Sequence, residues 1–317
     1  MVPKLSIVFT SYNHREYLRQ AIESILGQTY KDFELIIVDD CSTDGSQLIL
    51  QEYEKVENVR LYLQKENSGS YVKASNFGAS QAKGEYLLFA QCDDFAELNQ
   101  ISTLMASFNL SPSIGVSFCR SNLVDEQGEI IGDDFNVRES SFKILCVKNT
   151  IIQKNKMRSF LAKSCVIPNL SAAIIKRDLY IQSNGLSEKY IVAADWAFWL
   201  KLTEYCDFFY VSAPLNNFRQ HKTTIRSTVK IKRQVLEIYD LFYSHMRNYS
   251  MTHSESQGFR IGAGSIWLSY FSQGPKSWLI SFPGLIGRTF IYEKFNLWYL
   301  VRGFFYKIKE YLKRKIS

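Results

Sequence analysis

The feature of this chain that most restricts its fold is a regular alternation of short apolar runs with amphipathic helical runs near the N-terminus. Each apolar run is rich in β-branched and aromatic residues, and a polar turn follows it before apolar residues recur at helical spacing. This order is typical of an α/β fold with a doubly wound, mostly parallel sheet. We predict strands at 5–10, 33–38, 59–63 and 85–90, and helices at 15–27, 47–56 and 71–82.

The middle of the chain continues with less regular elements. Residues 140–165 are basic and mixed, and their pattern favours neither a helix nor a strand clearly. From residue 226 the chain is expected to be helical, and it is rich in aromatic and basic residues from Ile266 onward. We predict helices at 97–109 and 195–204, strands at 115–120, 172–176 and 207–211, and a hairpin or loop at 125–137.

Polar segments directly follow three of the predicted strands. These segments are Ser11-Tyr12-Asn13, Asp39-Asp40 and Asp93-Asp94. In a doubly wound sheet, ligands bind beyond the carboxyl ends of the strands. We therefore expect the three segments to converge on one crevice and to form a binding site there.

The Asp93-Asp94 pair is the sharpest chemical signal in the sequence. Two adjacent carboxylates repel each other unless a cation lies nearby, and hard divalent ions such as Mg²⁺ prefer carboxylate oxygens, often together with substrate phosphates. Either acidic pair alone could be a solvated turn with capping residues. Two such pairs at neighbouring strand ends favour a metal-bridged nucleotide instead.

No glycine-rich phosphate loop follows the first strand, because neither G-x-x-x-x-G-K-[ST] nor G-x-G-x-x-G occurs there. This argues against a P-loop NTPase and a nicotinamide enzyme, and a nucleotidyltransferase would also need a basic glycine-rich loop at this place. Recognition of a diphosphate would then depend on a metal ion and basic side chains. The net charge of +7 favours acidic partners, but the basic residues favour the C-terminal tail, so no nucleic-acid partner is expected.

Two further residues could carry chemistry. Asp195 opens a predicted helix, where it is either a simple N-terminal helix acid or a general base that faces the crevice. His221 lies in a polar loop, where it is either a surface or packed imidazole or a metal ligand.

The segment from Leu5 through His221 resembles the family 2 glycosyltransferases, which have the GT-A fold, a Rossmann-like version of the predicted sheet. The resemblance implies inverting transfer of a sugar from a nucleoside-diphosphate sugar to an acceptor hydroxyl. Any one of its motifs is weak, but their combination in this order is specific. The matching stretches are Ser6-Ile-Val-Phe-Thr-Ser-Tyr-Asn13, Ser24-Ile-Leu-Gly-Gln-Thr29, Phe33-Glu-Leu-Ile-Ile-Val-Asp-Asp-Cys-Ser-Thr-Asp-Gly-Ser46, Asn76-Phe-Gly78, Gly84-Glu-Tyr-Leu-Leu88 and Asp93-Asp94.

The resemblance also implies a role for each matching site residue. Thr10 and Tyr12 would line the base pocket, and Asp40 would bind the nucleobase. Asp93 would contact the ribose. By the same resemblance, Asp94 would hold Mg²⁺ or Mn²⁺ on the diphosphate, Asp195 would be the catalytic base, and His221 would join the metal or the diphosphate.

The sequence departs from the family pattern at several positions. Gln91 stands where the metal motif usually begins with Asp, and Ala194 stands where an acidic residue commonly precedes the base. Ser75 replaces a frequent Arg, so Lys73 is proposed as a substitute contact to the diphosphate. These departures leave open a catalytically silent sugar-nucleotide-binding protein on the same fold. The Gln-x-x-Arg-Trp motif of processive polymerases is absent, which favours addition of a single sugar.

The resemblance also predicts a domain division. Residues 1–225 would form the catalytic domain, with a nucleotide-sugar half at about 1–96 and an acceptor half at about 97–225. The donor would be linked to UDP or dTDP, and the acceptor would be a glycan or a lipid-linked glycan of bacterial surface polysaccharide biosynthesis. Loops within 125–165 are expected to set specificity.

The C-terminal region, 226–317, is expected to be a helical extension with an amphipathic last helix. An anionic membrane surface is one candidate partner for this helix, and packing on the catalytic domain is the alternative. Its apolar face comprises Leu297, Val301, Phe304, Phe305, Ile308, Tyr311 and Leu312, with Arg302, Lys307, Lys309, Lys313, Arg314 and Lys315 around it.

The sequence also bears on location. The six cysteines show neither a C-x-x-C pair nor zinc-site spacing, and they are expected to be ordinary thiols in a reducing compartment. The apolar run at 5–10 is too short for a signal peptide, and no stretch of about eighteen uninterrupted apolar residues predicts a spanning helix. We therefore expect a cytoplasmic protein, with peripheral binding to the inner face of the cell membrane as a further hypothesis.

Overall fold

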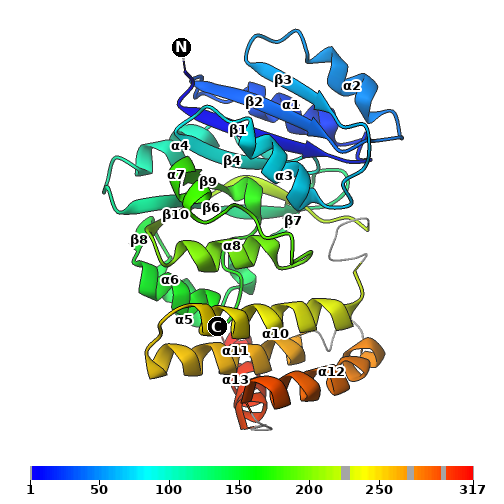
Figure 1. Ribbon diagram of the computed structural model, residues 1–317. Helices are drawn as coiled ribbons and strands as arrows, with labels where there is room; N and C mark the ends of the chain where they lie inside the picture. Colours follow the sequence, from blue (N-terminus) through cyan, green and yellow to red (C-terminus); the bar gives the residue numbers. More distant parts are fainter. Residues whose placement is uncertain (1, 223–228, 270–274, 294–297, 317) are drawn as a thin grey trace.

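The computed structural model describes residues 2–222, 229–269, 275–293 and 298–316, which are drawn in colour in Figure 1. A ten-stranded sheet has the order β3-β2-β1-β4-β9-β6-β10-β5, with β7 paired to β6 and β8 to β10. The strands are β1 (Leu5–Ser11), β2 (Phe33–Asp39), β3 (Val59–Leu63), β4 (Tyr86–Gln91), β5 (Phe95–Ala96), β6 (Ile114–Val124), β7 (Ile130–Asp133), β8 (Thr150–Ile152), β9 (Ala173–Lys176) and β10 (Asp207–Arg219).

Helices cover both faces of the sheet, and a further group of helices forms a layer at one end of the molecule (Figure 1). The helices are α1 (Leu18–Leu26), α2 (Ser46–Glu52), α3 (Tyr71–Ser80), α4 (Gln100–Ser107), α5 (Ser140–Leu145), α6 (Lys154–Leu161), α7 (Arg177–Gln182), α8 (Ala194–Leu202), α10 (Ile231–Asn248), α11 (His253–Ser269), α12 (Pro275–Glu293) and α13 (Trp298–Ile316), with 3-10 turns η1 (Phe135–Val137) and η2 (Leu170–Ala172).

The predicted alternation of strands and helices near the N-terminus is confirmed. β1 pairs in parallel with β2 and β4, and β2 pairs in parallel with β3. The helix predicted at 15–27 begins only at Leu18, because the preceding residues form a turn in which the backbone N–H of Tyr17 donates to the carbonyl of His14 at 3.0 Å. The carboxyl ends of β1, β2 and β4 therefore meet at one edge of the sheet, as expected.

The second half of the sheet departs from the mostly parallel prediction, because β9 pairs antiparallel with β4 and β6, and the short strands β5, β7 and β8 also pair antiparallel with their neighbours. The strand expected at 207–211 continues to Arg219, so β10 has 13 residues. Its pairing with β6 is interrupted by register shifts on either side of Pro214, a residue that cannot donate a ladder hydrogen bond. The apolar pattern breaks at this irregularity, but pairing resumes beyond it and carries the end of β10 toward the loop after β4.

The sheet separates two apolar cores, as a doubly wound arrangement requires. Leu5, Ile7 and Phe9 on β1 lie in one core with side chains of α1, α2 and α4. Val8 lies in the other core with side chains of α3, α6, α8 and α10. Strand residues point alternately to the two faces, and this is why an almost continuous apolar run is needed here.

The glycine of the Asn76-Phe-Gly78 motif is required by the packing of α3 on the sheet. A Cβ atom at this position of α3 would lie 2.4 Å from Cγ1 of Val8 on β1 and 3.2 Å from Cγ2 of Val38 on β2. Only glycine allows α3 to approach the two central strands this closely. Because α3 begins beside the carboxyl ends of these strands, its close packing positions the loop before Tyr71 at the same edge.

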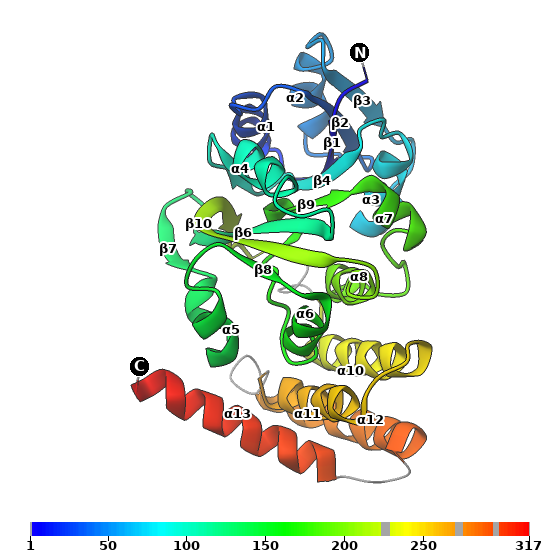
Figure 2. The same cartoon turned by 90° about the vertical axis from the view of Figure 1, so that its left-hand side faces the viewer.

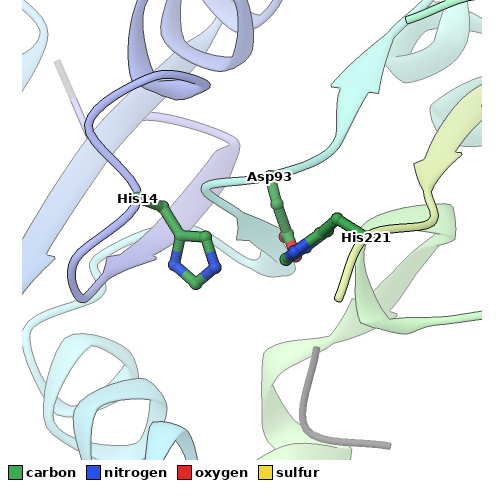
Figure 3. Close-up of side chains that lie close together, drawn as sticks. All are labelled: His14, Asp93 and His221. Atoms are coloured by element: carbon green, nitrogen blue, oxygen red, sulfur yellow. The ribbon is translucent and has the colours of Figure 1, made fainter. Parts of the chain in front are cut away.

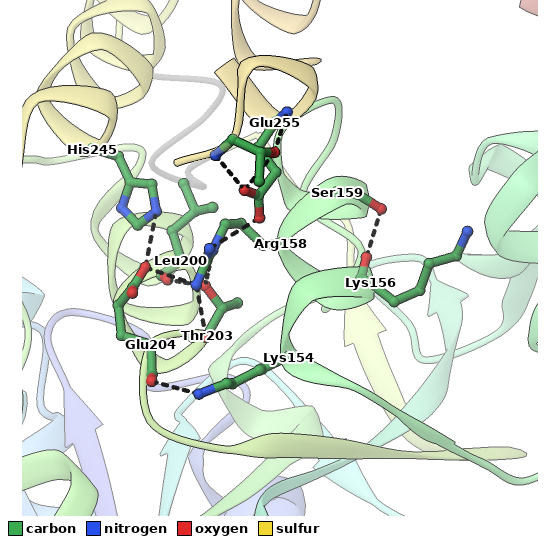
Figure 4. A network of polar contacts seen from close by, with 10 residues as sticks. Lys154, Lys156, Arg158, Ser159, Leu200, Thr203, Glu204, His245 and Glu255 are labelled. Atoms are coloured by element: carbon green, nitrogen blue, oxygen red, sulfur yellow. Dashed lines mark hydrogen bonds and ion pairs between the residues drawn. The ribbon is translucent and has the colours of Figure 1, made fainter. Parts of the chain in front are cut away.

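The ambiguous stretch at 140–165 folds as α5, β8 and α6. α6 joins the C-terminal helices to the sheet through Arg158, whose side chain is 7% exposed (Figure 4). Its guanidinium lies 3.0 Å from Glu204 and 3.0 Å from Glu255 of α11, and Nε donates to Thr203 Oγ1 at 3.2 Å. A buried cation is tolerated only when it is paired in this way. The C-terminal layer is therefore packed on the sheet domain through a buried ionic network.

The last helix, α13, lies along α11 and beneath α5 (Figures 1 and 2). A Cβ at Gly303 would lie 2.5 Å from the backbone nitrogen of Ser265, so the two helices cross at very short range. Glu310 is buried and accepts hydrogen bonds from the backbone and the hydroxyl of Ser140 on α5. Part of the predicted amphipathic helix thus packs on the protein, whereas Leu297 lies outside the described residues.

The outward side of the same helix is apolar. The exposed apolar side chains of α13 are Trp298, Val301, Phe304, Phe305, Ile308, Tyr311 and Leu312, with exposures between 37% and 63%.

Within the described residues, no helix has both the length and the apolar character needed to cross a membrane.

Candidate active site

A cavity of about 570 Å³ lies where β1, β2 and β4 end. The loop before α3, the segment around η2, the N-terminal end of α8 and the residues after β10 enclose its other sides. Of the sequence-predicted site residues, Thr10, Tyr12, Asp40, Asp93 and Asp195 line the cavity. The remaining lining residues are Ser11, His14, Asn67, Gly69, Ser70, Tyr71, Ala74, Gln91, Cys92, Pro168, Asn169, Leu170, Ile191, Val192, Phe218, Gln220 and Val229.

The loops after β1 and β2 are locked to each other. Asn13 adopts a left-handed backbone with φ of 52°, which asparagine tolerates better than most residues. Its Oδ1 accepts from the backbone N–H of Thr43 at 2.8 Å, and its own N–H donates to Ser42 Oγ at 3.0 Å. The Ser-Tyr-Asn motif therefore shapes one wall of the cavity through its asparagine.

The side chain of Asp40 lines the cavity and is hydrogen-bonded to the loop before α3. Its two carboxylate oxygens accept from the backbone N–H and the hydroxyl of Ser68, both at 2.9 Å. Asp40 is only 5% exposed, whereas Tyr12, which lines the same cavity, is 45% exposed. Asp40 thus holds the loop and presents a polar edge beside an exposed aromatic ring, which suits a planar base.

Three side chains from distant parts of the chain meet at one side of the cavity (Figure 3). Nε2 of His221 lies 2.9 Å from Oδ2 of Asp93. The ring of His14 stands edge-on to the ring of His221, with 5.3 Å between their centroids. One ligand atom from each of the three residues lies within 4.8 Å of the others. Two imidazoles and a carboxylate are a donor set that suits a divalent metal ion.

His14 is the member of this cluster that sequence reasoning missed. Nδ1 lies 2.8 Å from the carbonyl oxygen of Tyr12, and a carbonyl can only accept, so Nδ1 carries the proton. Nε2 then has a lone pair, and this buried atom has no hydrogen-bond partner among the described residues. The only signal was its place directly after the Ser-Tyr-Asn segment. The orphaned nitrogen supports the fit of a metal ion to this cluster.

The structure places Asp94, the predicted metal ligand, outside the group of described side chains that could hold an ion. Asp94 is 4% exposed, does not line the cavity, and accepts hydrogen bonds from Asn169, Ser171 and the backbone of Arg219. Burial, and next the charge of Asp93, raise the pKa of the Asp94 carboxyl well above its ordinary value. Asp94 is a buried anchor, and the carboxylate that faces the two histidines is Asp93.

Arg219, near the end of β10, is a second residue that the sequence did not reveal. Its guanidinium is buried and donates to the carbonyls of Asp93 at 2.8 Å, Asp125 at 3.0 Å and Glu126 at 2.8 Å, and to the side chain of Gln20. It also lies 4.5 Å from the centre of the Tyr17 ring. Arg219 therefore fixes the backbone of Asp93 without lining the cavity itself.

Of the two remaining predicted site residues, Asp195 lines the cavity and Lys73 does not. Asp195 lies in the first turn of α8, lines the cavity, and accepts from the backbone N–H of Trp196 at 2.7 Å. Lys73 is exposed on α3 and does not line the cavity, so the structure does not support it as a contact to a diphosphate. Position 73 falls on the outward side of α3 because its neighbours Val72 and Ala74 pack into the core.

The chain has the GT-A fold, which it shares with solved glycosyltransferases. A Staphylococcus aureus TarS fragment in complex with UDP-GlcNAc superposes with a TM-score of 0.69, at 19% identity, over 88% of this chain and 79% of that one. The Pyrobaculum calidifontis mannosyltransferase PcManGT, in complex with GDP-Man and Mn²⁺, has a TM-score of 0.56 at 15% identity and covers 97% and 88%. The predicted fold class is thus confirmed.

Within that class, the chain belongs to glycosyl transferase family 2, whose family model matches residues 6–179. TuaG of Bacillus subtilis, named for teichuronic acid biosynthesis, is 36% identical over 151 residues, which are 47% of this chain and 59% of TuaG. Glycosyltransferase GlyG of Streptococcus pneumoniae is 31% identical over 188 residues, 57% of this chain and 60% of GlyG. The chain thus matches about three-fifths of the length of these relatives.

Proposed function

We propose that this chain transfers a single sugar from a nucleoside-diphosphate sugar to an acceptor hydroxyl with inversion at the anomeric carbon. The proposal depends mainly on one observation. In a chain of glycosyl transferase family 2, a nucleotide-sized cavity lies at the ends of β1, β2 and β4. Asp195 lines this cavity, and the cluster of His14, Asp93 and His221 lies at one side of it. In this proposal residues 1–96 supply the nucleotide side of the site, and 97–225 supply the acceptor side.

The donor in this proposal is a UDP- or dTDP-linked sugar. Thr10, Tyr12 and Asp40 form the wall against which the base would lie, and the structural relative TarS has been solved with UDP-GlcNAc. The acceptor is a lipid-linked or growing surface glycan. This choice is supported by the names of two relatives, TuaG for teichuronic acid and TarS for poly(ribitol-phosphate), although TarS matches over only 94 residues.

The proposed mechanism gives each of these side chains a role. Asp93 and His221 would hold a divalent ion, Mg²⁺ or Mn²⁺, and this ion would supply positive charge for the departing diphosphate. Asp195 accepts the proton of the acceptor hydroxyl while the acceptor oxygen forms its bond to the anomeric carbon. The bond from that carbon to the diphosphate breaks, and its electron pair leaves with the diphosphate. The apolar residues Ile191, Val192 and Phe218 line the same cavity, where they would limit the access of water to the reacting atoms.

The test is a panel of nucleotide sugars with Mn²⁺, read by donor hydrolysis and by thermal shift. A UDP-sugar should raise the melting temperature and should be consumed slowly by hydrolysis. NMR of the product with an added acceptor should show inverted anomeric configuration. Retention would contradict the proposed chemistry, and donor binding without any turnover would favour the silent sugar-nucleotide-binding protein.

We also propose that α13 binds an anionic membrane surface, because exposed aromatic and aliphatic side chains lie there among basic residues. Full-length protein should bind phosphatidylglycerol vesicles, and the double variant Phe305→Ser/Leu312→Ser should bind several-fold less. The matched control is Ile130→Ser/Ile131→Ser, which removes two equally exposed apolar side chains from β7. Equal binding by the two double variants would contradict this surface.

A further inference from the structure

We propose that His14 is a third protein ligand of the metal ion and that it makes the site prefer a first-row transition ion, such as Mn²⁺ or Co²⁺, over Mg²⁺. This inference builds on the proposed function, since it concerns the same metal ion. It goes further, because it assigns a ligand from the loop after β1 and a metal class to this particular chain.

The separations of the ligand atoms fit one ion. Two ligands at right angles on an ion with bonds of about 2.1 Å lie about 3 Å apart, and two opposite ligands lie about 4.2 Å apart. Asp93 Oδ2 and His221 Nε2 are 2.9 Å apart, so they already have the spacing of adjacent ligands. The whole set lies within 4.8 Å, and a shift of less than 1 Å would bring the widest possible pair into the range of one ion.

The hydrogen bonding of His14 selects the ring tautomer that binding of a metal ion through Nε2 requires. Metal-bound histidines usually donate their second ring N–H to a carbonyl or a carboxylate, which orients the ring. Nδ1 of His14 makes such a bond to the carbonyl of Tyr12 at 2.8 Å. Nε2 is left with its lone pair, buried and without a hydrogen-bond partner among the described residues. Leaving such an atom unpaired is costly, so a ligand that occupies it explains its presence.

The position of the ring is also constrained. The imidazole of His14 packs against the rings of Tyr17 and His221, with centroid separations of 6.1 Å and 5.3 Å. Asn13 holds the preceding backbone in its left-handed conformation through Thr43. The lone pair of Nε2 is therefore held beside Asp93 by the fold before any ion arrives.

The donor set determines which ion is preferred. Mg²⁺ favours oxygen ligands and keeps several waters, whereas imidazole nitrogen favours the first-row transition ions. A site with Asp93 and only one histidine would discriminate weakly between Mg²⁺ and the first-row transition ions. A second imidazole replaces an oxygen ligand by nitrogen, and this change raises the affinity for Mn²⁺ and Co²⁺ more than that for Mg²⁺.

The experiment measures metal binding directly on the full chain in the presence of saturating UDP. Mn²⁺ is titrated and free Mn²⁺ is read by EPR, and Mg²⁺ affinity is obtained by competition. Wild type, His14→Ala and the control His253→Ala are compared, since His253 is an exposed histidine on α11. Pulsed EPR of bound Mn²⁺ reports its nitrogen ligands, and thermal melting confirms that each variant is folded.

We expect His14→Ala to weaken Mn²⁺ binding about tenfold or more and Mg²⁺ binding at most about threefold. The nitrogen modulation of bound Mn²⁺ should fall in this variant and remain unchanged in His253→Ala. Unchanged Mn²⁺ affinity and modulation in folded His14→Ala would overturn the assignment, and equal losses for both ions would overturn the preference. If wild type binds Mn²⁺ through His14 but consumes no nucleotide sugar, the proposed function fails while this inference stands.

Discussion

The adjacent residues Asp93 and Asp94 allow a sharp test, because the structure gives them opposite roles. Asp94→Asn should destabilise the fold and leave the metal ligands in place. Asp93→Asn should lower stability less than Asp94→Asn does and should weaken metal binding at least about tenfold. Each variant is the matched control for the other, since both replace one carboxylate by an amide of the same size at neighbouring positions.

The expected loss for Asp94→Asn follows from its hydrogen bonds. The carboxylate of Asp94 accepts from Asn169, from Ser171 Oγ at 2.8 Å and from the backbone N–H of Arg219 at 3.1 Å. An asparagine has one acceptor oxygen, and its NH₂ group replaces the other. At least one buried donor then faces another donor, which costs about 1–3 kcal/mol. At roughly 2–4 °C per kcal/mol, the melting temperature should fall by roughly 2–12 °C.

The assay is thermal unfolding at neutral pH together with Mn²⁺ titration of the three proteins. Asp93→Asn should lower the melting temperature less than Asp94→Asn does, because an amide oxygen can still pair with His221 Nε2 and the charge that raises the pKa of the buried Asp94 is removed. Its Mn²⁺ affinity should fall at least about tenfold. The reasoning is refuted if Asp94→Asn melts like wild type and loses Mn²⁺ binding, since Asp94 would then be the metal ligand.

Three more predictions concern other parts of the molecule. Asp195→Asn should keep UDP-sugar binding by thermal shift but lose on the order of 10²–10⁴ in transfer rate, and near-normal turnover would contradict its role as base. Burial, and to a lesser extent the charge of Arg158, lower the pKa of His245 to about 3. The unfolded state gains this proton near pH 6.5, so stability is full above that pH and falls as pH drops through it, by at most about 1.4 kcal/mol per unit. Urea unfolding at pH 7 and pH 5 should show this slope in wild type and a smaller one in His245→Phe; equal slopes would contradict it. Arg219→Lys should lower both the melting temperature and the Mn²⁺ affinity, because lysine cannot reach all the carbonyls that the guanidinium holds; an unchanged Mn²⁺ affinity would show that Arg219 does not position Asp93.

The local pattern of the sequence was enough to predict the first four strands and the edge of the sheet where the site lies. A buried parallel strand needs a continuous apolar run, and parallel strands end at the same edge, so Thr10, Asp40 and Asp93 could be brought together without a structure. Asp195 was predicted at the start of α8 because the residues after it are rich in aromatic side chains, Trp196, Phe198 and Trp199.

Other features of the site depend on contacts between segments that are distant in the sequence. The local sequence pattern carries no information about such contacts. Which of two adjacent carboxylates faces the cavity is decided by the turn after β4, which points Asp94 at Asn169 and Ser171. The roles of His14 and Arg219 exist only because β10 resumes beyond Pro214 and returns beside the loop after β4. The sequence by itself determined the class of fold and the edge where chemistry can occur, since these follow from hydrophobic periodicity. Only the tertiary structure decided which side chains face one another, because that depends on packing between segments more than a hundred residues apart.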